Sequence, residues 1–475
     1  MKYTFFKKIV SLSLLVTSLG VSMSAPFLSA AHAGETNNVS LSSQTVSQTD
    51  TSKNLSDTEW PAAPQTEAAN VILIDADTGG ILYEKDADKR CYPASTTKIL
   101  TGLLTIENCS MDETVTFSTE AANSVKWDEA NLASKPGEQF TVDQALHGLL
   151  MYSANEMAYG LAEHVAGNLS SFVDMMNERA KELGAKNTHF NNASGLYDPN
   201  HYTTARDLAL IARGCYNNAS FINIDSTYTS YTIPPTNMTS TPRTFQHRHM
   251  MLKNRAYYYE YCKGGKTGFT DQSQYTLVTF AEKDDMRLIA VCLNGSADGR
   301  FMDTRALFDW GFNNFKKVTS AGNTLSSLLS SDNYYNSAVY NKYNVNFNLD
   351  ASSLTIPNNG SVGSVSIKAD DTDATTDENG DFKTLIDFKY GDHTVGSANL
   401  TLSTTDRAKE ASNLPYITSE DETNAPKAKK CFVINIWVLG GIALVGIIAF
   451  YIFHDLKQSR ERKARFYQRK RRRRY

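Results

Sequence analysis

The chain has 475 residues, of which 41% are hydrophobic and 21% charged, so its composition is that of a folded protein and excludes a wholly disordered chain. The formal net charge of −4 is unevenly distributed. The segment 1–33 carries +3 and the segment 454–475 carries +9, which leaves −16 for the segment 34–431. Such an acidic body argues against binding to nucleic acid or another polyanion.

Both ends of the chain are typical of targeting segments. Residues 1–33 have a basic start, an apolar stretch and a final Ala-His-Ala, which predicts a signal peptide. Residues 432–453 contain no charge and are long enough to cross a hydrocarbon core of roughly 30 Å as a helix, the alternative being a buried core helix. The basic tail, 454–475, then stays in the cytoplasm. We expect a single-pass protein of the cell membrane with an extracytoplasmic body.

Changes in composition divide the body of the chain. Residues 34–67 are polar and predicted to be a disordered linker. Residues 68–316 mix strand-like and helix-like segments and predict a catalytic α+β domain. Short alternating runs predict a small all-β domain at 317–406, and the polar composition of residues 407–431 predicts a stalk to the membrane.

The elements of the α+β domain are expected in a definite order. Apolar runs on either side of Asp77-Thr78-Gly79-Gly80 predict a β-hairpin. Helical periodicity follows from Ser95 to about Arg213, including residues 142–166 and 170–183. A second hairpin turns at residues 282–285, and an amphipathic helix follows it. Strands at both ends of this segment predict an antiparallel sheet closed by residues far apart in sequence.

A hydroxyl and an amine lie three residues apart in "PASTTKILTG", where Ser95 and Lys98 share one side of an apolar helix. A lysine can remove the proton of a serine hydroxyl only if burial or a nearby cation lowers its pKa. The helix start would also direct backbone N–H groups at developing negative charge. Taken alone, the pair could equally be a helix-start serine with a surface lysine.

Two further motifs follow. Ser153-Ala154-Asn155 offers a hydroxyl that can relay a proton and an amide that can orient a lysine, but Ser-x-Asn also occurs elsewhere in the chain. Lys266-Thr267-Gly268 offers two groups that can hold a carboxylate beside a glycine that lets a substrate backbone approach. By itself this motif could be a turn before a strand.

The three motifs, which begin in this order at Ser95, Ser153 and Lys266, resemble the signature of the penicillin-interacting serine enzymes. Within that group the chain is most similar to the low-molecular-weight penicillin-binding proteins, the serine-type D-Ala-D-Ala carboxypeptidases of peptidase family S11. Further matching segments are "HFNNASGLYDPNHYTTARDLALIAR" and "GRFMDTRALFDWGF". The resemblance implies a penicillin-binding-protein-like α+β domain followed by a β-rich domain and a membrane anchor.

The resemblance also implies catalytic roles. Ser95 would be the acylated nucleophile and Lys98 its base. Ser153 would relay a proton, and Asn155 would position Lys98 or the substrate.

Substrate-binding roles are implied for the third motif. Lys266 and Thr267 would bind the terminal carboxylate of the peptide beside the strand edge at Gly268. The N–H of Phe269 would complete an oxyanion hole with that of the nucleophile. Arg300 would support recognition of the carboxylate.

The implied partners are peptidoglycan stem peptides ending in D-Ala-D-Ala and β-lactam antibiotics, with no cofactor. No metal is expected, because His247 and His249 have no ligand cluster beside them in the sequence. The six cysteines are expected to be free. A class A β-lactamase is an alternative, although the Glu-x-x-x-Asn expected after the second motif is not found; a catalytically silent wall scaffold is another.

Overall fold

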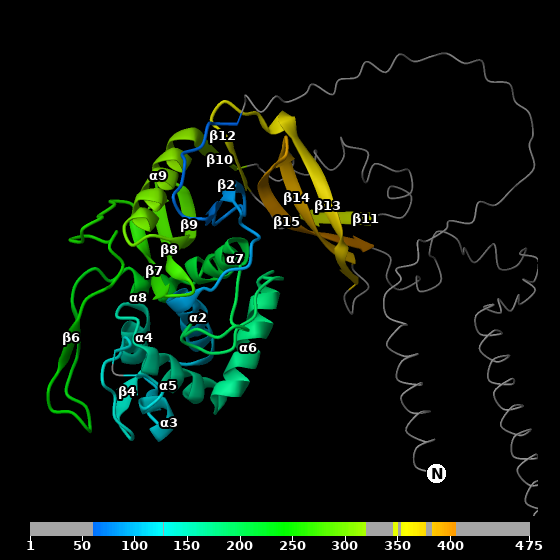
Figure 1. The fold of residues 1–475 in the computed structure, drawn as a ribbon. Coiled ribbons are helices and arrows are strands. Elements are labelled where there is room, and N and C mark those ends of the chain that lie inside the picture. Colours follow the sequence, from blue (N-terminus) through cyan, green and yellow to red (C-terminus); the bar gives the residue numbers. More distant parts are fainter. Residues whose placement is uncertain (1–59, 127, 320–344, 350–352, 377–381, 405–475) are drawn as a thin grey trace, which may run out of the picture. The chain divides into compact units, whose positions relative to one another are not determined.

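The computed structural model describes residues 60–319 except Trp127, and residues 345–349, 353–376 and 382–404 (Figure 1). The predicted signal peptide (1–33), stalk (407–431), membrane helix (432–453) and basic tail (454–475) lie outside these residues. Among the residues that the structure describes, no helix is long and apolar enough to span a membrane.

A five-stranded antiparallel sheet forms the centre of the α+β domain, with strand order β2-β1-β9-β8-β7. These strands are β1 (Asn70–Asp75), β2 (Ile81–Lys85), β7 (Cys262–Thr270), β8 (Gln274–Lys283) and β9 (Met286–Gly295). Both predicted hairpins are present, as β1-β2 and β8-β9. The sheet is closed by residues far apart in sequence, because Val71 of β1 pairs with Cys292 of β9.

Helices cover both faces of this sheet (Figure 1). Alternate strand residues point to opposite faces, so Ile72 packs with one group of helices and Leu73 with the other layer. The first layer contains α2 (Lys98–Asn108), α4 (Val142–Leu150), α5 (Asn155–Ala166), α6 (Leu169–Glu182), α7 (Ala205–Tyr216) and α8 (Ala219–Asp225). The second is α9 (Gly299–Asn314), whose Leu307 and Phe308 are buried.

Short elements complete the domain. They are η2 (Ala94–Thr97), β3 (Thr114–Thr116), α3 (Thr119–Ala122), β4 (Gln139–Thr141), β5 (Tyr231–Ile233) and β6 (Arg243–Phe245).

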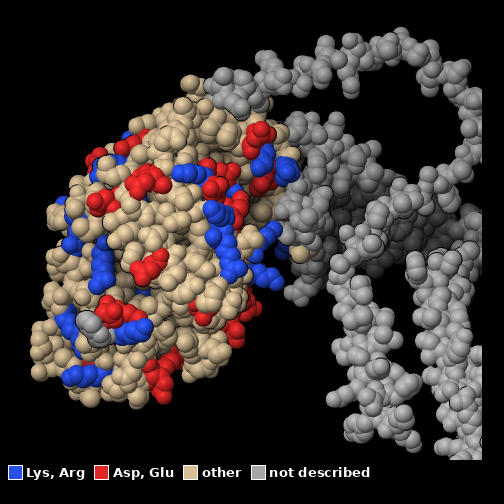
Figure 2. All heavy atoms as spheres, viewed as in Figure 1, with Lys and Arg blue, Asp and Glu red and all other residues tan. Residues whose placement is uncertain are grey.

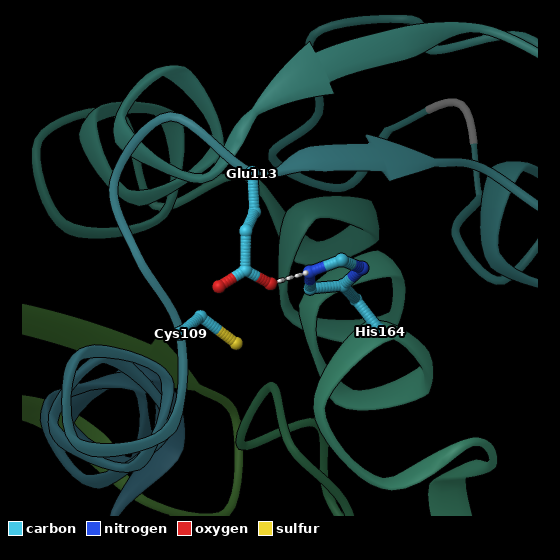
Figure 3. Close-up of side chains that lie close together, drawn as sticks. All are labelled: Cys109, Glu113 and His164. Carbon is cyan, nitrogen blue, oxygen red and sulfur yellow. Dashed lines mark hydrogen bonds and ion pairs between the residues drawn. The ribbon is translucent and has the colours of Figure 1, made fainter.

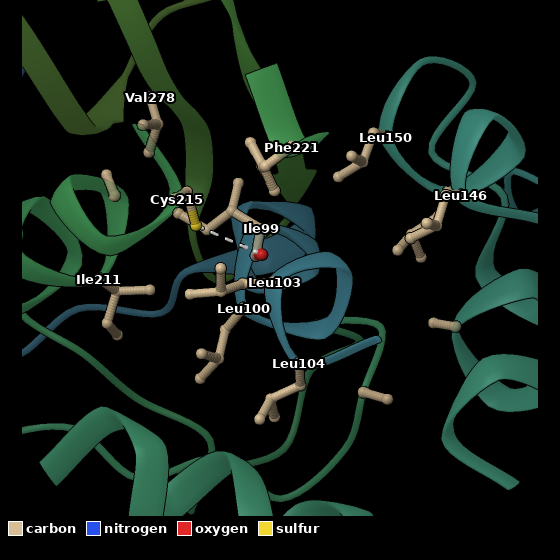
Figure 4. Packing of buried hydrophobic residues seen from close by; sticks show 14 of the residues in the cluster. Ile99, Leu100, Leu103, Leu104, Leu146, Leu150, Ile211, Cys215, Phe221 and Val278 are labelled. Atoms are coloured by element: carbon tan, nitrogen blue, oxygen red, sulfur yellow. Dashed lines mark hydrogen bonds between the residues drawn. The ribbon is translucent and has the colours of Figure 1, made fainter. Parts of the chain in front are cut away.

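Helix α2 lies in the middle of the first layer (Figure 4). Its Ile99, Leu100, Leu103 and Leu104 are at most 4% exposed. Side chains from four other elements surround them, namely Leu146 and Leu150 of α4, Ile211 and Cys215 of α7, Phe221 of α8 and Val278 of β8. Residues 98–105 of α2 are therefore buried, as the apolar sequence predicts, whereas Glu107 and Asn108 in its last turn are exposed.

The helical pattern of residues 142–166 is interrupted in the structure. Helix α4 ends at Leu150 and α5 begins at Asn155, because Ser153 adopts a left-handed backbone conformation with φ of 68°. Two backbone hydrogen bonds hold the break: Ala154 N donates to Gly148 O and Asn155 N donates to Ala130 O. Hydrophobic periodicity alone does not reveal this interruption.

A β-rich region follows α9. Strand β10 (Phe315–Thr319) pairs with β12 (Ser353–Pro357), and a four-stranded sheet has the order β11-β15-β14-β13. The remaining bounds are β11 (Val345–Leu349), η3 (Val362–Ser364), β13 (Val365–Thr376), β14 (Phe382–Tyr390) and β15 (His393–Thr404). Leu354 and Ile356 of β12 are buried in one cluster with Ile386 and Phe388 of β14.

The ordered fold begins before the predicted residue 68. The Trp60 ring stacks on the His393 ring with centroids 3.8 Å apart and meets Phe315 edge-on. Trp310 Nε1 donates a hydrogen bond to Ala62 O at 2.8 Å. Residues 60–67, predicted to belong to a disordered linker, therefore make defined contacts with α9 and with the β-rich region.

Charges of both signs are interspersed over the described part of the face in Figure 2. Neither sign forms a continuous band on this face.

The enclosure of α2 generates a stability prediction. Leu103→Ala should lower the free energy of unfolding by about 2–5 kcal/mol, because it leaves a cavity in a close-packed core. Met302→Ala on α9, where the side chain is 57% exposed, should change it by less than about 0.5 kcal/mol. Urea unfolding followed by circular dichroism measures both, and similar losses would contradict this account of the core.

Candidate active site

Ser95 and Lys98 are held where the turn η2 joins α2. Ser95 lies in η2, and Lys98 is the first residue of α2. The turn is fixed against the sheet because Thr276 Oγ1 of β8 donates a hydrogen bond to Pro93 O at 3.0 Å. The hydroxyl of Ser95 therefore lies at a helix start beside the sheet, while the side chain of Lys98 is enclosed.

The Lys98 amine is surrounded by oxygen atoms that carry no charge. Its Nζ lies 3.0 Å from Ser95 Oγ, 2.6 Å from Asn155 Oδ1 and 2.6 Å from Ser194 O. The Lys98 side chain has no exposed surface. Burial, and next the nearby charge of Lys266, hold the pKa of Lys98 well below its usual range.

The second and third motifs meet at a hydrogen bond between Lys266 and Ser153. Lys266 of β7 is 1% exposed, and its Nζ donates to Ser153 Oγ at 2.9 Å and to Thr267 O at 2.8 Å. Burial, with a contribution from Arg248, lowers the pKa of Lys266 to about 7. Two buried amines, each bonded to a serine hydroxyl, therefore share one site.

Strand β7 passes unusually close to the nucleophile candidate. A Cβ on Gly268 would lie 2.8 Å from Ser95 N and 2.4 Å from Thr276 Oγ1, so only glycine fits without a shift. Phe269 is next in the strand and is 49% exposed. Arg300 Nη1 donates to Gly268 O and to Thr276 O, each at 3.0 Å, and thereby braces β7 against β8.

A cleft of about 990 Å³ opens over these groups. Seven of the nine site residues expected from the sequence line it: Ser95, Ser153, Asn155, Thr267, Gly268, Phe269 and Arg300. The other two, Lys98 and Lys266, lie buried beneath its surface. All three motifs thus converge on one cavity.

The cleft also contains residues that the sequence reading did not identify. Arg248 lines it and places a positive charge near both lysines. Gly195 and Tyr197 line it as well, and Ser194 supplies a carbonyl to Lys98. For Ser194, Gly195 and Tyr197 the only signal in the sequence was the segment "NNASGLY", as part of the family resemblance; Arg248 lies outside that segment.

The histidines on either side of Arg248 are internal braces. His247 Nε2 faces Asp225 Oδ1 at 3.3 Å, and His249 Nε2 faces Thr279 Oγ1 at 2.9 Å. Both rings are at most 2% exposed, and burial lowers the pKa of His249. Asp225 also accepts a hydrogen bond from Gly265 N at 2.6 Å, which ties this segment to β7.

The fold and the converging motifs define a domain of the penicillin-binding-protein and β-lactamase type. The peptidase S11 family, described as D-alanyl-D-alanine carboxypeptidase, matches residues 57–297, which is just over half of the chain. The chain belongs to this family.

Individual relatives agree with this assignment. The chain is 34% identical over 257 residues to D-alanyl-D-alanine carboxypeptidase DacF of Bacillus subtilis and 33% identical over 267 residues to DacA of Escherichia coli. These matches cover 53% and 54% of this chain and 63% and 64% of the relatives, so less than two thirds of either relative is spanned. The crystal structure of penicillin binding protein 6B from Escherichia coli matches with a TM-score of 0.52 and 26% identity, over 71% of this chain and 96% of that one.

Two glycines with similar backbone angles test how tightly the site is built. Gly195 has φ of 85°, and a Cβ there would lie 1.8 Å from Ala94 O; Gly137 has φ of 79° and nothing within 4 Å. Gly137→Ala should lower the free energy of unfolding by about 1–2 kcal/mol through backbone strain. Gly195→Ala should lose roughly 1–3 kcal/mol more, because the new methyl must displace η2. Thermal unfolding measures both, and equal losses would contradict the close approach.

Proposed function

We propose that the protein is a serine-type D-Ala-D-Ala carboxypeptidase that removes the terminal D-Ala of peptidoglycan stem peptides through an acyl-enzyme on Ser95. The observation that carries this proposal is the fully buried Lys98, whose Nζ lies 3.0 Å from Ser95 Oγ among uncharged acceptors. A neutral amine fits these partners: it donates its two protons to Asn155 Oδ1 and Ser194 O and accepts the hydroxyl proton of Ser95.

The acylation step follows from these contacts. As Ser95 Oγ attacks the penultimate D-Ala carbonyl, its proton passes to Lys98 and a C–O bond to the acyl carbon forms. The C–N bond to the terminal D-Ala then breaks. Ser153 bridges from the cleft to Lys266 and can deliver the proton that the leaving amine requires. The proton that Lys98 took from Ser95 replaces the one that Ser153 gave up, so both groups are neutral again. Water then cleaves the ester: its oxygen and one proton go to the acyl carbon, and its other proton passes through Lys98 to Ser95 Oγ.

Groups along β7 are suited to hold the substrate. The N–H groups of Ser95 and Phe269 would bind the oxyanion of the tetrahedral intermediate. The Thr267 hydroxyl and the positive charges of Lys266 and Arg248 favour the terminal carboxylate of the peptide. Arg300 would act through the strand, since its two hydrogen bonds hold β7 in place.

The same serine would be acylated by penicillins, whose strained amide presents a carbonyl to the nucleophile and whose carboxylate would occupy the site of the peptide terminus. A single-pass membrane location with the cleft on the extracytoplasmic side is supported by three segments of the sequence. They are the signal-like start, the uncharged segment 432–453 and the basic tail.

Labelling with penicillin tests the nucleophile. The wild-type chain should form a stable penicilloyl adduct on the peptide containing Ser95 and release D-Ala from a D-Ala-D-Ala peptide. Ser95→Ala should show neither, a loss of at least about 10³-fold in D-Ala release. Ser124→Ala is the matched control, because Ser124 lines the same cleft but its Oγ donates to Ala121 O rather than to either lysine.

Intact-mass spectrometry and a D-Ala assay decide between the alternatives. Penicillin that is turned over rapidly without a lasting adduct would favour a β-lactamase. If both adduct and D-Ala release are missing from the wild-type chain, a silent scaffold becomes the better interpretation. Normal activity in Ser95→Ala would refute the proposed nucleophile.

The pH dependence of acylation tests the pairing of the two lysines. Acylation needs neutral Lys98, so its rate should rise with pH as the pH passes the lowered pKa of that amine. The positive charge of Lys266 is one cause of the lowered pKa of Lys98. Without that charge the pKa of Lys98 should rise. In Lys266→Met the rising limb should therefore move to higher pH, whereas Lys266→Arg, which keeps a positive charge, should move it much less. Stopped-flow acylation by a chromogenic cephalosporin records the profiles; identical limbs in both variants would contradict the coupling.

A further inference from the structure

A cluster of three potential metal ligands lies at the ends of two helices that begin in the active site. Cys109 is the C-cap of α2, His164 lies in the last turn of α5, and Glu113 lies between α2 and β3. Their ligand atoms, one from each residue, all lie within 4.8 Å of one another. Figure 3 shows the three side chains directed toward one another from these separate segments.

The distances between the ligand atoms of the cluster approach those around a tetrahedrally coordinated metal ion. His164 Nε2 lies 3.1 Å from Glu113 Oε2, and Ser110 N donates to Glu113 Oε1 at 2.6 Å, which fixes the carboxylate. Ligand atoms around Zn²⁺ lie about 3.3–3.6 Å apart, as bond lengths of roughly 2.0–2.3 Å dictate. To bind one ion, the Cys109 sulfur must move inward and the hydrogen bond between His164 and Glu113 must open. Glu113 is exposed and the other two residues are partly exposed, so an ion can enter from solvent.

We infer that Cys109, Glu113 and His164 form a Zn²⁺-binding site, with water as the fourth ligand. A thiolate, an imidazole and a carboxylate together are a ligand set that favours zinc over magnesium or calcium, which prefer oxygen ligands. As the ion binds, the thiol proton of Cys109 and the proton shared by His164 Nε2 and Glu113 Oε2 pass to solvent. The inference does not rest on the proposed catalytic function, because none of the three residues lines the cleft.

The position of the site gives it a structural consequence. Helices α2 and α5 are joined at their first residues, where Lys98 Nζ bonds to Asn155 Oδ1 at 2.6 Å. An 11-residue helix is about 16 Å long, so the cluster lies at the opposite end of the same pair. A bound ion would link the two helices a second time and stabilise the folded state by mass action.

An ion pair without metal is the competing explanation. A histidine near a helix C-terminus is favourable by itself, and an exposed pair such as His164 and Glu113 needs no metal to form. The sulfur of Cys109 distinguishes the two explanations, because only a metal site requires it.

Metal titration of the full-length chain, purified metal-free with reduced thiols, tests the inference. Co²⁺ should produce a thiolate-to-cobalt charge-transfer band that Zn²⁺ abolishes, and Zn²⁺ should raise the Tm in a concentration-dependent way. Cys109→Ser and His164→Gln should each remove the band and weaken Zn²⁺ binding by at least about tenfold. Cys91→Ser is the matched control, since Cys91 is another partly exposed free thiol; it should change the affinity by less than about twofold.

Glu113→Gln keeps an oxygen for Ser110 N and serves as a second variant if Cys109→Ser folds poorly; it too should weaken Zn²⁺ binding by about tenfold. Zn²⁺ affinity that is the same in the wild type and in all three ligand variants, or a cobalt band that persists in Cys109→Ser, would overturn the site. Penicillin labelling of the same samples separates this result from the proposed function: labelling should be retained in all three ligand variants, whatever their metal affinity.

Discussion

The burial of one amine determines how the rest of the site is built. An ammonium group without exposed surface needs a paired charge, yet the contacts of Lys98 are a hydroxyl, an amide oxygen and a backbone carbonyl. The charge with the largest effect on the pKa of Lys98, that of Lys266, has the same sign. The surroundings therefore stabilise the neutral amine, and they can do so only because α2 is enclosed by other helices and the sheet.

A second requirement of the site is local backbone strain at Ser153, whose hydroxyl bonds to Lys266. Ser153 has a left-handed backbone, which costs a residue with a side chain about 1–2 kcal/mol. Backbone hydrogen bonds from Ala154 and Asn155 hold the chain there, so the strain persists where a hydroxyl must face Lys266. On the remaining side, Gly268 allows β7 to approach η2 without a clash.

Much of this arrangement could be predicted from the sequence. The antiparallel sheet and the apolar surroundings of α2 follow from hydrophobic periodicity, and the three motifs together indicated the family.

Three features of the structure could not be predicted from the sequence. The break between α4 and α5 depends on a hydrogen bond to Ala130, which lies in another segment. Trp60 is ordered by His393, which belongs to the β-rich region near the other end of the described chain. Cys109 and His164 come together only because two helices of similar length start at the same place. Each depends on contacts between distant residues that no local pattern records.

The strand order has a consequence for how the domain assembles. Strand β1 is hydrogen-bonded to β2 and to β9, and β1 is the first strand of the domain whereas β9 is the last strand of its sheet in the chain. The first hairpin therefore lacks its second neighbour until nearly the whole domain has been synthesised. Long-range pairing of this kind slows folding, because the entropy of closing a large loop must be overcome before the contacts form. The helices of the first layer can form earlier from local contacts, so the pocket for Lys98 should be completed only when β7, β8 and β9 arrive.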